Sequence, residues 1–338
     1  MLRSLVGSEM CIRDREATMP VFESYVSPKA TGATKEDLDP KLNLLSQMET
    51  PFYSSIGRGT TTNRYPELIQ RQLAAANTNA QIENFAFANG VTDGGDRRQF
   101  NTQIFSKGYE VSGTEQASDS VTYEAKKRLA EQRAIFALEL KRDMEFAICR
   151  NGAGTAGSTT GARQLTGYFS QIGTLQQHPM GTRSDTNNYN AGTVLEDLIN
   201  DAARSLYESG GLSYKMGNSF VKNANLLVMS PAVMTAFDRR LDAKSSTYRQ
   251  TNSGGMLGVE VTKYGSSFGP LMVCPDIHLQ DANAAVLNPM NWKWITLRPT
   301  HEQEIAKIGD GERRQLVHEG TLMHRHLSAS ASITGLAP

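Results

Sequence analysis

The chain has 338 residues, 39% of them hydrophobic and 21% charged, enough to bury a core in one large domain or two ordinary ones. Its 35 basic and 35 acidic residues balance, which argues against a dedicated nucleic-acid binder but leaves weak, nonspecific contact with DNA open. No apolar run approaches the ~18 residues that a membrane helix needs, so we expect no membrane partner.

The first 50 residues divide into two parts. Residues 5–15, LVGSEMCIRDR, resemble one reading frame of a sequencing adapter and lack the apolar core of a signal peptide. We therefore expect residues 1–18 to be a sequencing artefact and the true start to be Met19. Residues 19–50 are polar, with three prolines and a short apolar patch, which predicts an extended arm with at most one helical turn.

Residues 51–120 combine two predicted strands with a segment that cannot bury a core. Thr61–Glu67 and Gln103–Ser112 have strand patterns, and between them lies AAANTNAQIENFAFANGVTDGGDRRQ, rich in Ala, Asn and Gly. A two-stranded hairpin alone is marginal in water, and so long a loop in a compact domain needs a function. We expect this segment to lie on another subunit.

Residues 122–151 have the strongest helix pattern, with no Gly or Pro to interrupt it before Gly152. Apolar residues recur at three- and four-residue steps: Leu129, Ile135, Phe136, Leu140, Met144, Ala147 and Ile148. About 30 residues at 1.5 Å each give a rod of roughly 45 Å. The charged cluster Glu139, Lys141, Arg142, Asp143 and Glu145 is expected to be a solvated face, with exposed intersubunit pairs as the alternative.

The stretch NGAGTAGSTTG, residues 151–161, contains the spacing G-x-G-x-x-G at Gly152, Gly154 and Gly157. A dinucleotide site needs a strand before these glycines and a helix after them, whereas here they follow the predicted helix. We interpret the stretch as a flexible helix-exit turn and expect no cofactor.

Residues 193–294 predict a mixed α/β unit. Thr193 and Glu196 match a capping box for a helix to Glu208, and Ser230-Pro231 predicts the start of a helix that runs to Leu241. The predicted strands are Ala224–Met229, Val259–Tyr264, Leu271–Cys274, Ala285–Leu287 and Trp292–Leu297, with Gln315–His326 beyond the unit.

Histidine and cysteine spacing predicts no metal site. His318, His324 and His326 would share one strand face, where we expect a hydrated or interfacial polar surface. Cysteines 11, 149 and 274 show neither disulfide nor metal spacing and fit a reduced compartment. We expect Cys149 and Cys274 to be buried apolar residues.

A second enzyme-like pattern is Gly265–Gly269, which matches G-x-S-x-G with Ser267 as the nucleophile. That motif requires a strand-to-helix turn, but Pro270 and a predicted strand follow, so we expect a hairpin turn. No paired carboxylates, Walker loop or metal-ligand cluster stands out. We therefore expect a protein that is not an enzyme and has no catalytic, cofactor-binding or metal-binding residues.

Several segments together resemble the major capsid proteins of tailed bacteriophages. They are TPFYSSIGRG (50–59), AAANTNAQIE (74–83), YEVSGTEQA (109–117), LELKRDMEFAI (138–148), ARQLTG (162–167) and LRPTHEQEIAKIGDGERRQLVHEGTL (297–322). The similarity runs in order over most of residues 35–335, and LKRDMEF and KIGDGERRQLVHEGTL are its most specific parts. The resemblance implies an α+β fold of the HK97-like capsid type.

The resemblance also implies a division of the chain. After the excluded residues 1–18 come an N-terminal arm (19–50), an extended loop with flanking strands (51–120), a peripheral domain with a spine helix (121–192), an axial α/β domain (193–294) and a return to the peripheral domain (295–338). The strand at 313–328 would lie beside the spine helix.

The function implied by the resemblance is structural. The chain would assemble into pentamers and hexamers of an icosahedral head around double-stranded DNA, in the bacterial host cytoplasm, and would end in the virion. Its partners would be further copies of itself, with portal, scaffolding and decoration proteins as candidates. We expect subunit-interface contacts from Arg58, Arg64, Glu67, Arg97, Arg98, Lys107, Glu139, Lys141, Arg142, Asp143, Asp310, Arg313 and Arg314.

Two other functions stay open at this point. An encapsulin-like compartment would use the same fold to enclose an enzyme, and a neighbouring cargo gene rather than portal and terminase genes would identify it. A hydrolase with Ser267 as nucleophile would lose its activity in a Ser267→Ala variant.

Overall fold

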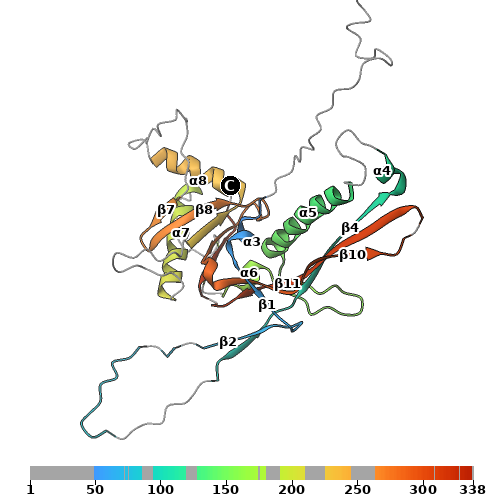
Figure 1. The fold of residues 1–338 in the computed structure, drawn as a ribbon. Helices are drawn as coiled ribbons and strands as arrows, with labels where there is room; N and C mark the ends of the chain where they lie inside the picture. The colour runs from blue at the N-terminus through green and yellow to red at the C-terminus, as the bar shows by residue number, and fades with distance from the viewer. Residues whose placement is uncertain are drawn as a thin grey trace, which may run out of the picture.

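The computed structural model describes residues 49–71, 73–74, 76–85, 94–118, 128–173, 176–179, 191–209, 225–244, 263–307, 309–326 and 328–336. Two larger sheets and one two-stranded ribbon make up its strands (Figure 1). The excluded start, the arm up to residue 48, the helix start at 122–127, Ala224 and the predicted strand residues 259–262 lie outside the described residues.

The first sheet has the strand order β1-β10-β11-β4. Its strands are β1 (Gly57–Thr60), β10 (Trp292–Ile305), β11 (Gly311–His324) and β4 (Gln103–Ser112). β1 is parallel to β10, and the other neighbours are antiparallel. The prediction for residues 103–112 is confirmed, whereas β10 and β11 extend beyond the predicted limits.

β10 is longer than predicted because its pairing continues past Pro299. A proline has no N–H to give to a ladder and belongs at an edge or a bulge. The register with β11 shifts between Thr296 and Arg298 and again between Arg298 and His301. Pairing then resumes and continues to Ile305, so the proline marks a bulge and not the end of the strand.

α5 (Arg128–Arg150) packs on β4 and β11 of this sheet. The helix prediction is confirmed over the described residues, and Leu140, Met144 and Ile148 are buried as their spacing predicts. Glu145 is also fully buried, so the expectation of a solvated face is wrong at this position.

The second sheet has the strand order β5-β12-β9-β6-β8-β7. Its strands are β5 (Gln177–Pro179), β12 (Ser330–Thr334), β9 (Ala284–Leu287), β6 (Asn225–Met229), β8 (Gly269–Pro275) and β7 (Lys263–Ser266). Leu227 and Met229 pack in one core with α7 (Ala191–Glu208) and α8 (Pro231–Lys244), while Val228 belongs to the core shared with α5. Both faces of β6 are therefore covered.

Three predictions are corrected. Of the predicted strand 61–67, residues 61–66 do not form a strand, because Tyr65 N–H donates to Asn63 Oδ1 (3.2 Å) and this local turn replaces ladder bonds before β2 (Glu67–Gln70). Thr193 lies inside α7 and is not its cap. β12 pairs with β9 and β5, so the chain end joins the second sheet and does not return to the sheet of α5.

Short helices that the sequence did not predict connect these layers: α3 (Pro51–Ser55), α4 (Gly113–Ala117), α6 (Tyr168–Gln171) and η3 (Pro289–Asn291). Ser230 caps α8 as predicted, since its Oγ accepts Val233 N–H at 3.4 Å. None of the helices in the described ranges is long and apolar enough to cross a membrane.

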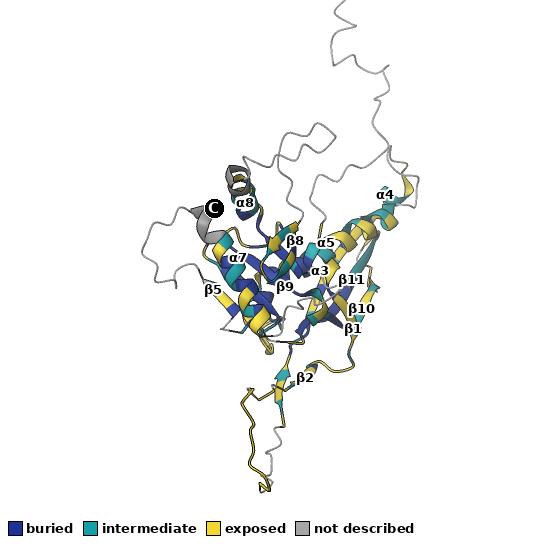
Figure 2. Ribbon diagram, turned by 90° about the vertical axis from the view of Figure 1, so that its left-hand side faces the viewer, coloured by how far each residue is buried: buried dark blue, intermediate teal, exposed yellow. Residues whose placement is uncertain are grey.

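An aromatic cluster joins the two sheets. Tyr168 lies 4.9 Å from both Phe52 and Trp292, measured between ring centroids. Trp292 Nε1 donates to Ser330 Oγ in β12 at 2.6 Å, and Tyr168 donates from its hydroxyl to a backbone carbonyl of the second sheet. The buried interior in Figure 2 is therefore continuous from one sheet to the other.

Candidate assembly surfaces

The extended loop is the segment 71–95 between β2 and β3 (Asp96–Gln99), and its described residues, 71, 73–74, 76–85 and 94–95, project from the body of the subunit (Figure 1). Leu73 and Ile82 are 94% and 80% exposed, and Ile69 on the adjoining β2 is 62% exposed. Figure 2 shows the described part of this loop coloured as exposed. These large apolar side chains are exposed on one segment that carries few other apolar residues, which makes the segment a candidate interaction site. The interface residues predicted here are all charged, and Leu73 and Ile82 are not among them, although isolated apolar residues in an Ala- and Asn-rich stretch are a usable signal.

One group of predicted interface residues lies at the root of this loop: Arg58, Arg64, Glu67, Arg97 and Arg98. Arg97 Nε lies 2.9 Å from Glu67 Oε2 across the β2–β3 ribbon. The Arg58 guanidinium lies 3.7 Å from the centroid of the Tyr53 ring and donates to the Tyr53 carbonyl. Arg98 is half-buried, and this burial lowers the pKa of its guanidinium. These contacts all lie within one subunit.

A second group gathers between β4 and α5. Lys107 Nζ lies 3.0 Å from Asp143 and 3.5 Å from Glu139, and the hydrogen bond that Lys107 donates to Asp143 is the main reason that the pKa of Lys107 is raised. Together with Arg142 these side chains line an open groove of about 360 Å³ whose wall includes the half-exposed Phe146. Lys141, also predicted, does not line this groove.

A third group lies where β10 turns into β11. The carbonyl of Asp310 accepts Gly113 N–H at 2.6 Å. Arg313 Nε lies 2.9 Å from Glu110, and Arg314 Nη1 lies 3.3 Å from Glu302. The predicted residues thus fall into separate surface groups, and many already have charged partners within the subunit.

Glu319, which the sequence analysis did not single out, organises a buried ion network. Its Oε1 contacts Arg163 and accepts a hydrogen bond from Thr102 Oγ1 (3.0 Å), while Oε2 lies 2.7 Å from Arg298 Nε. Arg163 lies in the chain that follows the glycine-rich stretch. The network therefore fixes that stretch against β11.

The two enzyme-like patterns have structural roles. Residues 151–161 leave α5 and turn back, with Thr155 bridging Gln164, which confirms a helix-exit turn in place of the nucleotide-binding geometry. Residues 265–269 form the hairpin between β7 and β8, so Ser267 lies in a tight turn and not on a nucleophile elbow.

The histidines correct a prediction, because His318 and His324 are buried while His326 is exposed. His318 Nε2 accepts the Trp294 Nε1–H at 3.0 Å, so the imidazole is neutral, and burial lowers its pKa to about 4. His324 stacks on Trp292 with centroids 3.9 Å apart, and burial lowers its pKa to about 3. The alternation of residues along the strand predicted one polar, hydrated face, but β11 is covered on both faces, so no such face exists.

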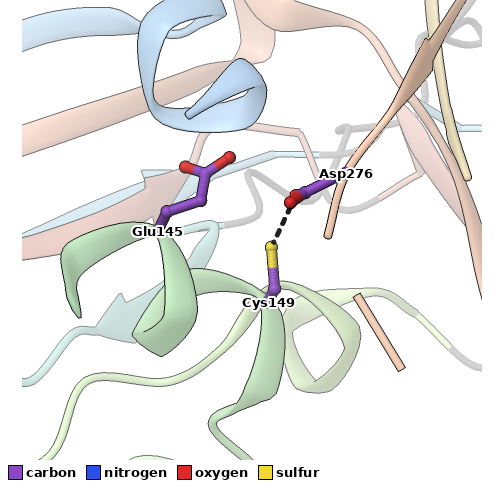
Figure 3. Close-up of side chains that lie close together, drawn as sticks. All are labelled: Glu145, Cys149 and Asp276. Carbon is purple, nitrogen blue, oxygen red and sulfur yellow. Dashed lines mark hydrogen bonds between the residues drawn. The ribbon is translucent and has the colours of Figure 1, made fainter. Parts of the chain in front are cut away.

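Glu145, Cys149 and Asp276 form a buried polar cluster between α5 and the loop after β8 (Figure 3). Their ligand-type atoms lie within 4.8 Å of one another, and the Cys149 thiol donates to Asp276 Oδ2 at 3.2 Å. Burial, followed by the charge of Asp276, raises the pKa of Glu145 to about 8. Every member already has a hydrogen-bond partner in the protein, so we interpret the group as an acid pair and not as a metal site.

The cysteine predictions are confirmed only in part. Cys149 is buried, but its surroundings are polar, and burial raises the pKa of its thiol so that it acts as a hydrogen-bond donor. Cys274 is only half-buried. The polar environment of Cys149 had one sequence signal, since Glu145 lies one helical turn before it.

The sequence and the fold were compared with those of known proteins. The family model described as SU10 major capsid protein matches residues 24–337, and no curated protein matches the chain. The capsid of a native GTA particle is 13% identical, with a TM-score of 0.64 over 93% of this chain and 99% of that chain. The capsid of cyanophage A-1(L) is 12% identical, with a TM-score of 0.62 over 92% and 99%.

A shell of another kind is also similar. The holo-SrpI encapsulin complex from Synechococcus elongatus PCC 7942 is 10% identical, with a TM-score of 0.54 over 94% of this chain and 95% of that chain. At such identities the structural likeness shows the fold alone, and it confirms the predicted α+β, HK97-like capsid fold. Since the family model covers most of the sequence, the chain belongs to the SU10 major capsid protein family.

Proposed function

We propose that this chain assembles into pentamers and hexamers that form the icosahedral head of a tailed bacteriophage around double-stranded DNA. Beyond family membership, one observation carries the proposal: the extended loop exposes large apolar side chains, Leu73 and Ile82 above all. Burying such a side chain contributes about 1.5–3 kcal/mol, which a neighbouring subunit supplies in an assembly.

The loop supports a head-to-tail mode of assembly. Each subunit would offer its extended loop to one neighbour and receive a loop from the other, a heterologous contact that closes into rings. The first sheet with α5 would form the peripheral domain, and the second sheet with α7 and α8 would form the axial domain around each ring centre. β12 would belong to the axial domain, because it pairs with β9.

The predicted charged residues would act at the rims of these contacts. The groups at the loop root, at Lys107 and at the β10–β11 turn are partly exposed and can exchange partners between subunits. Exposed pairs add little affinity but set orientation and exclude wrong partners.

The remaining parts of the proposal follow from the role of a shell. The balanced charge of 35 basic and 35 acidic residues supports weak, nonspecific contact with packaged DNA. Portal, scaffolding and decoration proteins are the further partners, and the subunit acts without catalysis. Assembly takes place in the host cytoplasm and the product is the virion.

Particle size tests this function directly. Residues 19–338 are expressed and examined by sedimentation and negative-stain microscopy. We expect shells, or rings that close into shells. A stable monomer or dimer under all assembly conditions contradicts the proposal.

One observation keeps a second candidate in view, because the encapsulin complex shares this fold over most of both chains. The contents of particles from the natural source separate the two functions. Double-stranded DNA inside supports a phage head, whereas a single foreign enzyme inside supports a compartment.

A further inference from the structure

The cluster around Glu145 is a buried group of titratable side chains within one subunit. Both Glu145 carboxyl oxygens accept backbone N–H groups at the start of α3, from Phe52 and Tyr53, at 2.7 Å each. Thr50, which precedes this helix, makes no side-chain cap to it. Glu145 therefore replaces the missing cap and binds α3 to α5.

Asp276 brings the second sheet to the same point. It lies in the loop between β8 and β9, where its N–H donates to the carbonyl of Met229 at 2.9 Å. Its Oδ1 accepts His278 N–H at 2.8 Å and its Oδ2 accepts the Cys149 thiol at 3.2 Å. The acid pair thus connects α3, α5 and the loop of the second sheet.

The surroundings do not supply a neutralising cation. The titratable and charged groups in and around the cluster are Glu49 and Tyr53 at α3, Arg142, Asp143, Cys149 and Arg150 on α5, Tyr168 on α6, and Cys274 and His278 on β8 and its following loop. Arg150 is committed to the carbonyls of His278 and Leu279, at 2.7 and 3.1 Å. In the described part of the chain, no basic side chain pairs with either carboxyl group.

Two carboxylates this close and this deeply buried repel each other strongly, so one proton is retained. We propose that Glu145 and Asp276 form a proton-operated joint: a proton shared by their carboxyl groups holds the β8–β9 loop against α5 and α3, and loss of that proton loosens the loop around Asp276. The joint is a property of one subunit and does not depend on how subunits assemble.

The direction of opening follows from the hydrogen bonds. Ionised Glu145 keeps its two N–H donors from α3, which stabilise its charge. The side chain of Asp276 has no tie to α5 beyond the Cys149 thiol, so the Asp276 carboxylate moves away and breaks its bond to that thiol. Arg150 keeps its bonds to the His278 and Leu279 carbonyls, so opening loosens the loop around Asp276 and exposes the Cys149 thiol, while α3 stays on α5.

The pH dependence has a defined sign. The pKa of Glu145 is raised to about 8 in the closed state and returns toward its usual value when the joint opens. The opening equilibrium constant therefore rises with pH, by up to roughly tenfold per pH unit, and levels off near pH 8.

Hydrogen exchange tests the joint in the intact protein. The peptide that spans Asp276 and His278 is followed by mass spectrometry from about pH 5.5 to about pH 9, with times corrected for intrinsic exchange. Alkylation of Cys149 by iodoacetamide, relative to unfolded protein at the same pH, gives a second measurement. We expect both rates to rise together until about pH 8 and then to level off.

Variants decide whether this proton is responsible. Glu145→Gln cannot ionise, and Asp276→Asn keeps the shape of the side chain while supplying a permanent donor. Glu145→Gln should give a profile that is flat with pH. Asp276→Asn leaves Glu145 buried but removes its charged neighbour, so its rise should level off at a lower pH. Glu131→Gln, in the first turn of the same helix, should behave as wild type. A flat wild-type profile, a rise that persists in a folded Glu145→Gln variant, or an unshifted rise in a folded Asp276→Asn variant overturns the proposal.

Discussion

Trp292 in the joined core and Leu73 in the extended loop are apolar residues in opposite situations. Trp292 is fully buried, within ring contact of Tyr168, Phe52 and His324, whereas Leu73 is almost fully exposed. The subunit encloses the Trp292 ring with its own residues and leaves Leu73 to solvent. We therefore predict that Trp292 stabilises the subunit and that Leu73 contributes only when a neighbour covers it.

Replacing the extended loop should have the largest effect, because it should abolish assembly and leave the stability of the subunit unchanged. A variant in which a short Gly-Ser turn replaces residues 71–95 retains β2 and β3 but has no exposed Leu73 or Ile82. We expect folded subunits with an unchanged free energy of unfolding that form no shells, measured by urea unfolding and by sedimentation.

A milder variant, Leu73→Ser with Ile82→Ser, serves as the matched control for loop length. It should weaken assembly while the loop stays long enough to reach a neighbour. Normal shells from the loop replacement would show that the loop is not the assembly contact.

Trp292→Ala should give the largest effect on the body. Removing a fully buried tryptophan costs about 3–5 kcal/mol, since the cavity loses its packing and Ser330 loses its hydrogen-bond partner. The urea midpoint of purified subunits should fall sharply. Leu73→Ala is the control and should change the free energy of unfolding by less than about 0.5 kcal/mol. If both substitutions lowered the free energy of unfolding equally, Leu73 would contribute to the stability of the subunit as much as Trp292 does, which would contradict the difference between the two regions.

The sequence predicted the parts of the body that depend on local periodicity. The apolar stripe of α5 and the limits of β4 follow from spacing alone. Glu145 and His318 could not be predicted, because their burial depends on partners far away in the chain, at Asp276 and Trp294. A charged residue on a helix is usually solvated, and only the tertiary contact reverses this expectation.

The assembly surfaces were also only partly predictable from the sequence. Composition indicated that the loop could not bury a core, but charge alone did not reveal which side chains it would expose. The pairing of β12 with β9 was also beyond prediction, since short strands of small residues carry little pattern. Long-range pairing is decided by the sheet that is available and not by the strand itself.

Acidification should lower the free energy of unfolding of the subunit by less than the Trp292→Ala substitution does. Buried His318 stays neutral because burial lowers its pKa to about 4, whereas an unfolded histidine titrates near 6.5. From about pH 6.5 down to about pH 4 the unfolded chain binds protons that the folded chain does not, so the free energy of unfolding falls. The loss from His318 is about 3 kcal/mol at most, since one pKa unit corresponds to about 1.4 kcal/mol.

His324 should act in the same direction, because burial lowers its pKa to about 3. Glu145 acts in the opposite direction, with its raised pKa favouring the folded state at low pH. A His318→Gln variant isolates the histidine contribution, and its urea midpoint should depend less on pH than that of wild type. An unchanged dependence would assign the acid sensitivity to other groups.

Lys107→Ala should have the smallest effect on the subunit and can sharpen the distinction between body and assembly surface. Lys107, Glu139 and Asp143 are 30%, 40% and 47% exposed, so solvent screens their attraction and the free energy of unfolding should change by no more than about 1 kcal/mol. If the group also pairs across subunits, the same substitution should lower the salt concentration at which shells dissociate. Light scattering during a salt titration measures this, with Arg204→Ala as an exposed ion-pair control on α7. An identical salt midpoint in wild type and Lys107→Ala would place the Lys107 group within the subunit alone, because a charge that contributes to an interface must change its response to screening.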